Sequence, residues 1–148
     1  MKKISSVVCL LFLVLPLIIS CQSNSSDWME YRVDNYGNVY SYKKGNIDKN
    51  NGNYIVQVFY KTVYSEKGRE KYLQERREKK YSTEGYDKLS HTVYSTEVDC
   101  KKQEIKLLSV VESYADGEKL FSWSNDKPEW INTIPGSEGE TVLKLNCE

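Results

Sequence analysis

The sequence predicts a mainly β (α+β) domain, an antiparallel meander sheet of about six strands with a short C-terminal helix tied to it by a disulfide. Three observations support this fold class. Short runs of alternating apolar and polar residues recur between turn-forming residues, as in half-buried strands. Twelve tyrosines and three tryptophans supply large side chains for a core in a chain that is only 39% hydrophobic. Two of the four cysteines lie far apart in the later part of the chain, where a disulfide between them would close the domain.

The first strands are predicted over residues 28–34 and 39–43, on either side of the turn-like residues 35–38. The clearest strand is predicted over residues 54–64, after the hairpin signal Asn51-Gly52. Both of its faces carry apolar side chains, so we expect it to be central and covered on both sides for part of its length.

Residues 65–80 change character, because they contain many helix formers and no β-branched residue. Seven Lys and Arg side chains stand against four Glu over residues 66–80. The segment is predicted to be a solvated helix or a long connection, and its charge suits either a soluble surface or a site for polyanions. A short second helical turn is predicted within residues 82–90.

Two further strands are predicted over residues 91–100 and 103–115, and a third over residues 118–123 after the tight turn Asp116-Gly117. Ser137, three residues before Glu140, then forms a capping box. The pattern predicts a short helix to about Asn146 with Thr141, Val142 and Leu145 as its apolar stripe. Gly139 and the β-branched residues weaken this helix, so a final strand is the alternative.

The first twenty residues carry the pattern of an export signal. Lys2 and Lys3 precede an apolar stretch over residues 7–19, which is too short for a membrane-spanning helix. The run Ile18-Ile19-Ser20-Cys21 matches a bacterial lipobox, in which the cysteine thiol receives a diacylglyceryl group and becomes the new N-terminus. The alternative is an ordinary signal peptide that happens to precede a cysteine. We therefore predict a lipoprotein signal peptide over residues 1–20 and lipidation of Cys21.

Acyl chains such as palmitate on one cysteine would hold the protein stably in a bilayer. Gln22, in place of Asp, favours the outer membrane over retention in the inner membrane. Residues 21–27 are predicted to be the lipidated cysteine and a polar tether, and residues 28–148 a single folded domain. The expected location is the outer membrane, at its periplasmic face or at the cell surface.

The remaining cysteines, Cys100 and Cys147, are predicted to pair, because an exported domain folds where disulfides persist. No metal site or cofactor is predicted, since His91 is the only histidine and no CxxC spacing is present. The zero formal charge argues against a nucleic-acid partner. Removing residues 1–20, with Lys2 and Lys3, leaves a net charge of −2.

Motifs of catalysis are absent from the sequence. It contains no GxSxG, HExxH, Walker or GxGxxG motif, and a single histidine leaves almost no route to a Ser-His-Asp triad. Carboxylates are plentiful, but nothing in the sequence pairs two of them. We therefore predict that the protein is not an enzyme.

The order of features along the chain resembles the surface-adhesin protein E family of bacterial lipoproteins. The resemblance rests on the lipobox, Trp28, the long central strand, Val98-Asp99-Cys100 at a strand end, the hairpin Tyr114-Ala115-Asp116-Gly117, the run from Trp130 to Ser137, and Cys147 at the end. It covers nearly all of residues 28–147.

The resemblance implies an antiparallel sheet with a C-terminal helix tied across it by a Cys100–Cys147 disulfide, and a homodimer. It also implies binding to host matrix and serum proteins such as vitronectin and laminin, through basic residues in the exposed middle of the chain. The corresponding basic segment here supplies the candidate ligand-binding residues Lys67, Arg69, Lys71, Arg76, Arg77, Lys79 and Lys80.

The leading hypothesis is therefore a lipid-anchored, non-enzymatic binding protein of the envelope or cell surface, an adhesin for host matrix or serum proteins. One alternative is a periplasmic lipoprotein that inhibits an envelope enzyme such as lysozyme. Two others are a structural accessory of the envelope and a small envelope enzyme. The sequence does not choose among these functions, because a fold transfers between relatives more readily than a function does.

Overall fold

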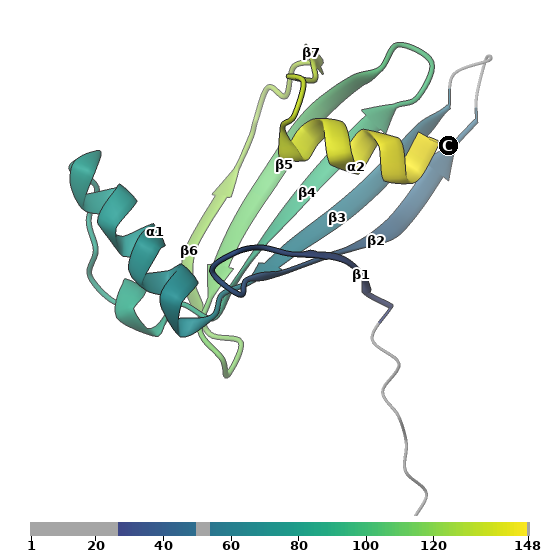
Figure 1. Ribbon diagram of the computed structural model, residues 1–148. Helices are drawn as coiled ribbons and strands as arrows, with labels where there is room; N and C mark the ends of the chain where they lie inside the picture. Colours follow the sequence, from purple (N-terminus) through teal and green to yellow (C-terminus); the bar gives the residue numbers. More distant parts are fainter. Residues whose placement is uncertain (1–26, 50–53, 148) are drawn as a thin grey trace, which may run out of the picture.

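A computed structural model describes residues 27–49 and 54–147, which form one antiparallel sheet and three helical segments (Figure 1). The strands are β1 (Met29–Val33), β2 (Val39–Asp48), β3 (Ile55–Val63), β4 (His91–Asp99), β5 (Glu104–Ser113), β6 (Lys119–Ser124) and β7 (Ile131–Asn132). The helices are α1 (Glu66–Glu78), the 3₁₀ turn η2 (Tyr86–Lys88) and α2 (Glu138–Cys147). Cys21, the signal peptide and the turn at Asn51-Gly52 lie outside the described residues.

The strands follow one another across the sheet in chain order from β1 to β6, and β7 pairs with β5. This confirms the predicted mainly β meander and its C-terminal helix. The sheet has seven strands rather than six, because Ile131 and Asn132 pair with Ile105 and Glu104. So short a strand, four residues before the turn at Gly136, shows no alternation that a sequence pattern could reveal.

Strand β2 continues to Asp48, five residues beyond the predicted end at Lys43. Its pairing with β3 changes register between Lys44 and Ile47, around Gly45. A bulge of this kind interrupts the apolar and polar alternation, so the sequence pattern ends before the strand does.

Both helices lie on the same face of the sheet. Along β3 the side chains of Val56 and Val58 point to this face and pack against α2. Tyr64, directly after β3, continues the same periodicity and contacts the ring of Tyr72 on α1 at a centroid distance of 5.3 Å. Figure 1 shows α2 crossing β3 to β5, while α1 stands apart from it near the opposite end of the strands.

The other face of β3 differs from the prediction that both faces are covered. Val56, Val58 and Thr62 are buried, but their neighbours on the opposite face are half-buried or exposed. Within the described ranges no helix covers this face. Phe59 and Lys61 are shielded there by side chains instead: the Lys61 ammonium lies 4.4 Å from the centre of the Trp28 ring.

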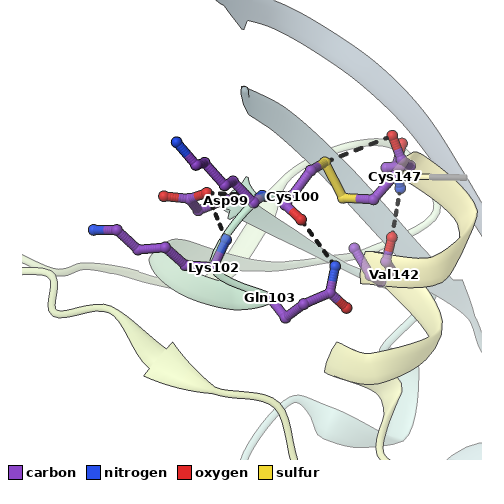
Figure 2. The surroundings of a disulfide bond; sticks show 8 residues. Asp99, Cys100, Lys102, Gln103, Val142 and Cys147 are labelled. Atoms are coloured by element: carbon purple, nitrogen blue, oxygen red, sulfur yellow. Dashed lines mark hydrogen bonds between the residues drawn. A yellow bond between two sulfur atoms is a disulfide. The ribbon is translucent and has the colours of Figure 1, made fainter. Parts of the chain in front are cut away.

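The main core lies between α2 and the sheet. It contains Val56, Val58, Val98, Ile105, Val142 and Leu143. The disulfide between Cys100, after β4, and Cys147, at the end of α2, borders this core and confirms the predicted pairing (Figure 2). The last element is thus a helix and not a strand.

Helix α2 begins at the predicted capping box, in which the Glu140 N–H donates to Ser137 Oγ at 3.2 Å. The return bond differs from a usual capping box, because Glu140 Oε2 accepts from the Gly136 N–H, at 2.8 Å, and not from the Ser137 N–H. Its buried side consists of Val142, Leu143 and Asn146, whereas the predicted stripe was Thr141, Val142 and Leu145. Because Cys147 is bonded to the sheet, the helix is rotated so that Leu143 and Asn146 face inward.

Candidate ligand-binding surface

Helix α1 is joined to the turn between β1 and β2 by a polar network centred on Asn38. Ser65 caps the helix, since its Oγ accepts from the Gly68 N–H at 3.0 Å. The buried Asn38 side chain accepts from the Ser65 N–H at 3.1 Å and donates to Asp34 Oδ2 at 2.9 Å. These contacts fix where α1 begins relative to the sheet.

Gly68 makes this junction possible. A Cβ atom added at Gly68 would lie 1.7 Å from Asn38 Oδ1, so the first turn of α1 can approach Asn38 only without a side chain. The sequence shows a glycine in a helical segment, but it gives no sign that a buried asparagine thirty residues earlier occupies the space.

Three of the seven predicted ligand-binding residues are engaged within the protein. Arg69 donates to the Leu89 carbonyl at 3.1 Å, and Arg76 donates to the Ser82 carbonyl at 2.8 Å. The Arg76 guanidinium also lies 3.6 Å from the centre of the Tyr86 ring, a cation–π contact. Lys71 pairs with Glu75 one helical turn away at 3.2 Å. Arg69 and Arg76 therefore anchor α1 and the chain that follows it.

The other four basic residues, Lys67, Arg77, Lys79 and Lys80, are exposed. Three of them gather at the C-terminal end of α1, beside Tyr81, whose side chain is 60% exposed. This end of α1 projects away from the sheet (Figure 1). We call Arg77, Lys79, Lys80 and Tyr81 the basic tip.

The basic tip has an unusual backbone at Lys80. Its φ of +57° is a left-handed conformation that glycine usually adopts. The Tyr81 N–H donates to the Arg76 carbonyl at 2.9 Å and the Lys80 N–H to the Arg77 carbonyl at 3.0 Å, the two bonds of a Schellman motif. A lysine here costs about 1 kcal/mol relative to glycine, because its Cβ atom crowds the backbone in this conformation.

The middle of α1 rests on the sheet through tyrosines and a buried carboxylate. Glu112 on β5 is only 4% exposed and accepts from the hydroxyls of Tyr72 and Tyr86, both at 2.6 Å. Burial and the bond to Glu112 raise the pKa of Tyr86 to about 12. Both phenols therefore remain donors, and the polar contact takes the place of an apolar core under α1.

Between the two helices lies a cleft of about 480 Å³. We call it the tyrosine cleft, because six tyrosines line it: Tyr36, Tyr40, Tyr60, Tyr64, Tyr72 and Tyr94. Its other lining side chains include Arg32 from β1, Lys71 and Glu75 from α1, and Glu138 from α2. The sequence places Tyr40, Tyr60 and Tyr94 on predicted strands, Tyr36 in a turn and Tyr72 in the helical segment. It could not show that these separate elements bring the tyrosines together.

Asp34 closes the tyrosine cleft at the turn between β1 and β2. It accepts hydrogen bonds from the backbone N–H groups of Tyr36 and Asn38, from the Asn38 amide and from the Tyr40 hydroxyl, at 2.9 to 3.0 Å. Burial acts to raise the pKa of Asp34, but the hydrogen bonds outweigh it and the pKa is lowered. The carboxylate is thus ionised and fully engaged.

Neither a metal-binding cluster nor a membrane-spanning helix is present in the described part of the chain. Among residues 27–49 and 54–147, no three His, Cys, Asp or Glu side chains are placed to hold a metal ion. None of the helices described in those ranges has the length and apolar character to cross a membrane.

Comparison with known proteins relates the chain to one family. Residues 28–148 match the family model described as surface-adhesin protein E. No curated protein matches the chain, and no solved structure does. The match spans every described strand and helix, from β1 to α2.

Proposed function

The chain belongs to the surface-adhesin protein E family, and from this membership we propose that it is a lipid-anchored, non-enzymatic adhesin that binds host matrix or serum proteins. The observation that carries the proposal is the basic tip. Its cations are solvent-exposed, and in the described part of the chain none of them forms a salt bridge. They are available to a partner.

The basic tip suits an acidic protein surface. Exposed charges steer an oppositely charged partner toward the site and speed association, an effect that salt screens. Tyr81 adds a large side chain of the kind that dominates binding energy at protein interfaces. Vitronectin and laminin, the partners that family resemblance implies, are the first ligands to test.

The test measures binding of the full chain, in detergent, to immobilised vitronectin and laminin. The variant carries Lys67→Gln, Arg77→Gln, Lys79→Gln and Lys80→Gln. A matched control removes the same charge from four exposed lysines elsewhere, through Lys101→Gln, Lys102→Gln, Lys119→Gln and Lys127→Gln. We expect the first variant, and not the control, to lose affinity by about tenfold, which corresponds to about 1.4 kcal/mol.

Two results would overturn the adhesin proposal. One is equal loss of affinity in both variants, because binding would then follow net charge alone. The other is failure of the unmodified chain to bind either protein while it captures only envelope proteins from a cell extract, as an inhibitor or accessory of the envelope would.

The proposed anchor is Cys21, after removal of residues 1–20, with residues 21–27 as a tether and residues 28–148 as the folded domain at the outer membrane. The composition of the lipobox supports this proposal. In the Cys21→Ser variant the chain should stay unprocessed or be released, and radiolabelled palmitate should no longer be incorporated. Membrane retention with normal processing in that variant would contradict lipidation at Cys21.

A further inference from the structure

The charged groups of the tyrosine cleft already have partners within the protein. Arg32 Nη2 lies 2.6 Å from Glu138 Oε2, and Lys71 pairs with Glu75. Asp34 is saturated by four hydrogen bonds from its own turn. The five ionisable acids and bases of the lining sum to a charge of −1. An anionic ligand would meet net repulsion, and a cationic one would have to displace an existing partner.

The hydroxyls of Tyr60 and Tyr94 in the cleft, unlike its charged groups, have no partner within the described residues. The rings of Tyr60 and Tyr94, on neighbouring strands, stack with centroids 4.6 Å apart and an interplanar angle of 9°. Within the described residues neither hydroxyl forms a hydrogen bond. The hydroxyls of Tyr40, Tyr64 and Tyr72, by contrast, are bonded to Asp34, Thr92 and Glu112.

The Tyr60 and Tyr94 hydroxyls also stay protonated. Burial raises the pKa of both tyrosines, and the nearby Tyr94 ring adds to the effect on Tyr60. Each neutral phenol can donate one hydrogen bond and accept another. The cleft therefore offers two adjacent donor–acceptor groups without a charge.

We propose that the tyrosine cleft binds a neutral saccharide chain, with the Tyr60 and Tyr94 hydroxyls as its hydrogen-bonding partners. A sugar presents hydroxyls that both donate and accept, and C–H groups that pack on the negative face of an aromatic ring. Tyr36, 43% exposed at the cleft, supplies such an aromatic surface.

The size and shape of the cleft suit this ligand. Its volume of about 480 Å³ falls within the range of roughly 300–1,000 Å³ that small-molecule sites occupy. The cleft is open to solvent along part of its surface, so a longer chain could enter and leave it. A peptide would be bound chiefly through its backbone at an unpaired strand edge, whereas the floor here is formed by β3 and β4, which are paired on both sides.

The proposal goes beyond the adhesin function and does not depend on the basic tip. Its test titrates the full chain, in a detergent without a sugar headgroup, with N-acetylchitotetraose, maltotetraose, a heparin tetrasaccharide and a neutral tetrapeptide of Gly, Ser and Tyr. Calorimetry with ligand up to about 10 mM would detect even a millimolar Kd. We expect at least one neutral oligosaccharide to bind, and the heparin fragment and the peptide not to bind at the cleft.

The variants are Tyr60→Phe, Tyr94→Phe and both together. Each single change should weaken binding by about threefold to tenfold, the effect of one lost hydrogen bond. The stacked rings remain, and neither hydroxyl has a partner within the described protein, so the unfolding temperature should not fall. Tyr54→Phe is the matched control. Tyr54 directly precedes β3 and is half-buried against the core, but it does not line the cleft.

Three results would overturn the proposal. The first is no binding of either neutral oligosaccharide by the unmodified chain. The second is binding that the double variant leaves unchanged. The third is a heparin fragment or peptide whose binding the double variant abolishes, which would assign the cleft to another class of ligand. None of these results would alter binding of matrix proteins through the basic tip.

Discussion

The two helices lie on the same face of one sheet, yet they are held by different forces. Helix α2 rests on an apolar cluster, in which Val56, Val58 and Val142 are fully buried, and a disulfide fastens its end. Helix α1 is held by hydrogen bonds: the Tyr72 and Tyr86 hydroxyls donate to the Glu112 carboxylate, and Asn38 accepts from the Ser65 N–H where the helix starts. Only Gly68 is buried in α1.

We propose that this difference separates stability from binding. Apolar burial is non-directional and supplies most of the free energy of folding, so the α2 region can hold the domain together. Hydrogen bonds contribute less on balance but fix geometry, and they leave the outer surface of α1 free for charged groups. Sites that bind ligands commonly lie in such less densely packed regions.

Loss of the disulfide should break the α2 region and have the largest effect. The 47-residue separation between Cys100 and Cys147 gives roughly 4 kcal/mol of stabilisation in the chain-entropy model. We expect the Cys100→Ser, Cys147→Ser variant to lose about that much free energy of unfolding in denaturant titrations. A loss below about 1 kcal/mol would mean that apolar packing alone holds α2.

Adding a methyl group at one glycine of each helix should sharpen the contrast. Gly68→Ala would overlap Asn38 and should lower the free energy of unfolding by about 2 kcal/mol, as overpacking does. Gly139→Ala in α2 meets only ordinary contacts, at 3.6 Å or more, and should raise it by about 0.5 kcal/mol. Thermal unfolding of both variants tests these opposite changes in stability. Equal destabilisation by the two substitutions would contradict the predicted difference between the helices.

Lys80→Gly should increase stability and weaken binding. Glycine adopts the left-handed conformation at this position without strain, so the free energy of unfolding should rise by about 1 kcal/mol. The same change removes one cation of the basic tip and should weaken binding to vitronectin or laminin. Unchanged or tighter binding would show that Lys80 does not contact the ligand.

The smallest expected effect is the pH dependence at His91, where β4 begins. Burial, assisted by the charge of Lys61, lowers the pKa of His91. The unfolded chain therefore binds a proton more readily, so stability is fully present above pH 6.5 and declines as the pH falls through the lowered pKa. Unfolding temperatures between pH 7 and pH 5 should fall less in His91→Gln. Equal slopes would mean that other groups dominate.

Much of the fold could be predicted from local patterns. Alternation identified β3 to β6, helix formers identified α1, and the Ser137–Glu140 spacing identified the start of α2. These features depend on neighbours within a few residues, which a sequence displays directly. The two-residue β7 and the extension of β2 past its bulge were not predicted, because neither carries an alternating pattern.

The candidate site was predicted only in part. The basic segment was identified, but its charge pattern did not distinguish Arg69 and Arg76, which bond to backbone carbonyls, from the exposed cations of the basic tip. The tyrosine cleft was not predicted, because Tyr36, Tyr60 and Tyr94 come from separate strands and turns. Only the pairing of the strands brings those side chains to one place.

We propose that stability resides with α2 and binding with the basic tip. The most direct test of this proposal measures the unfolding temperature and the affinity for vitronectin or laminin on the same samples of two variants. Leu143→Ala should lower the unfolding temperature, through a loss of about 2 kcal/mol or more, and keep its affinity while folded. The variant with Gln at positions 67, 77, 79 and 80 should lose about tenfold in affinity at an unchanged unfolding temperature. If affinity and unfolding temperature fell together in both variants, the division between the two helices would be contradicted.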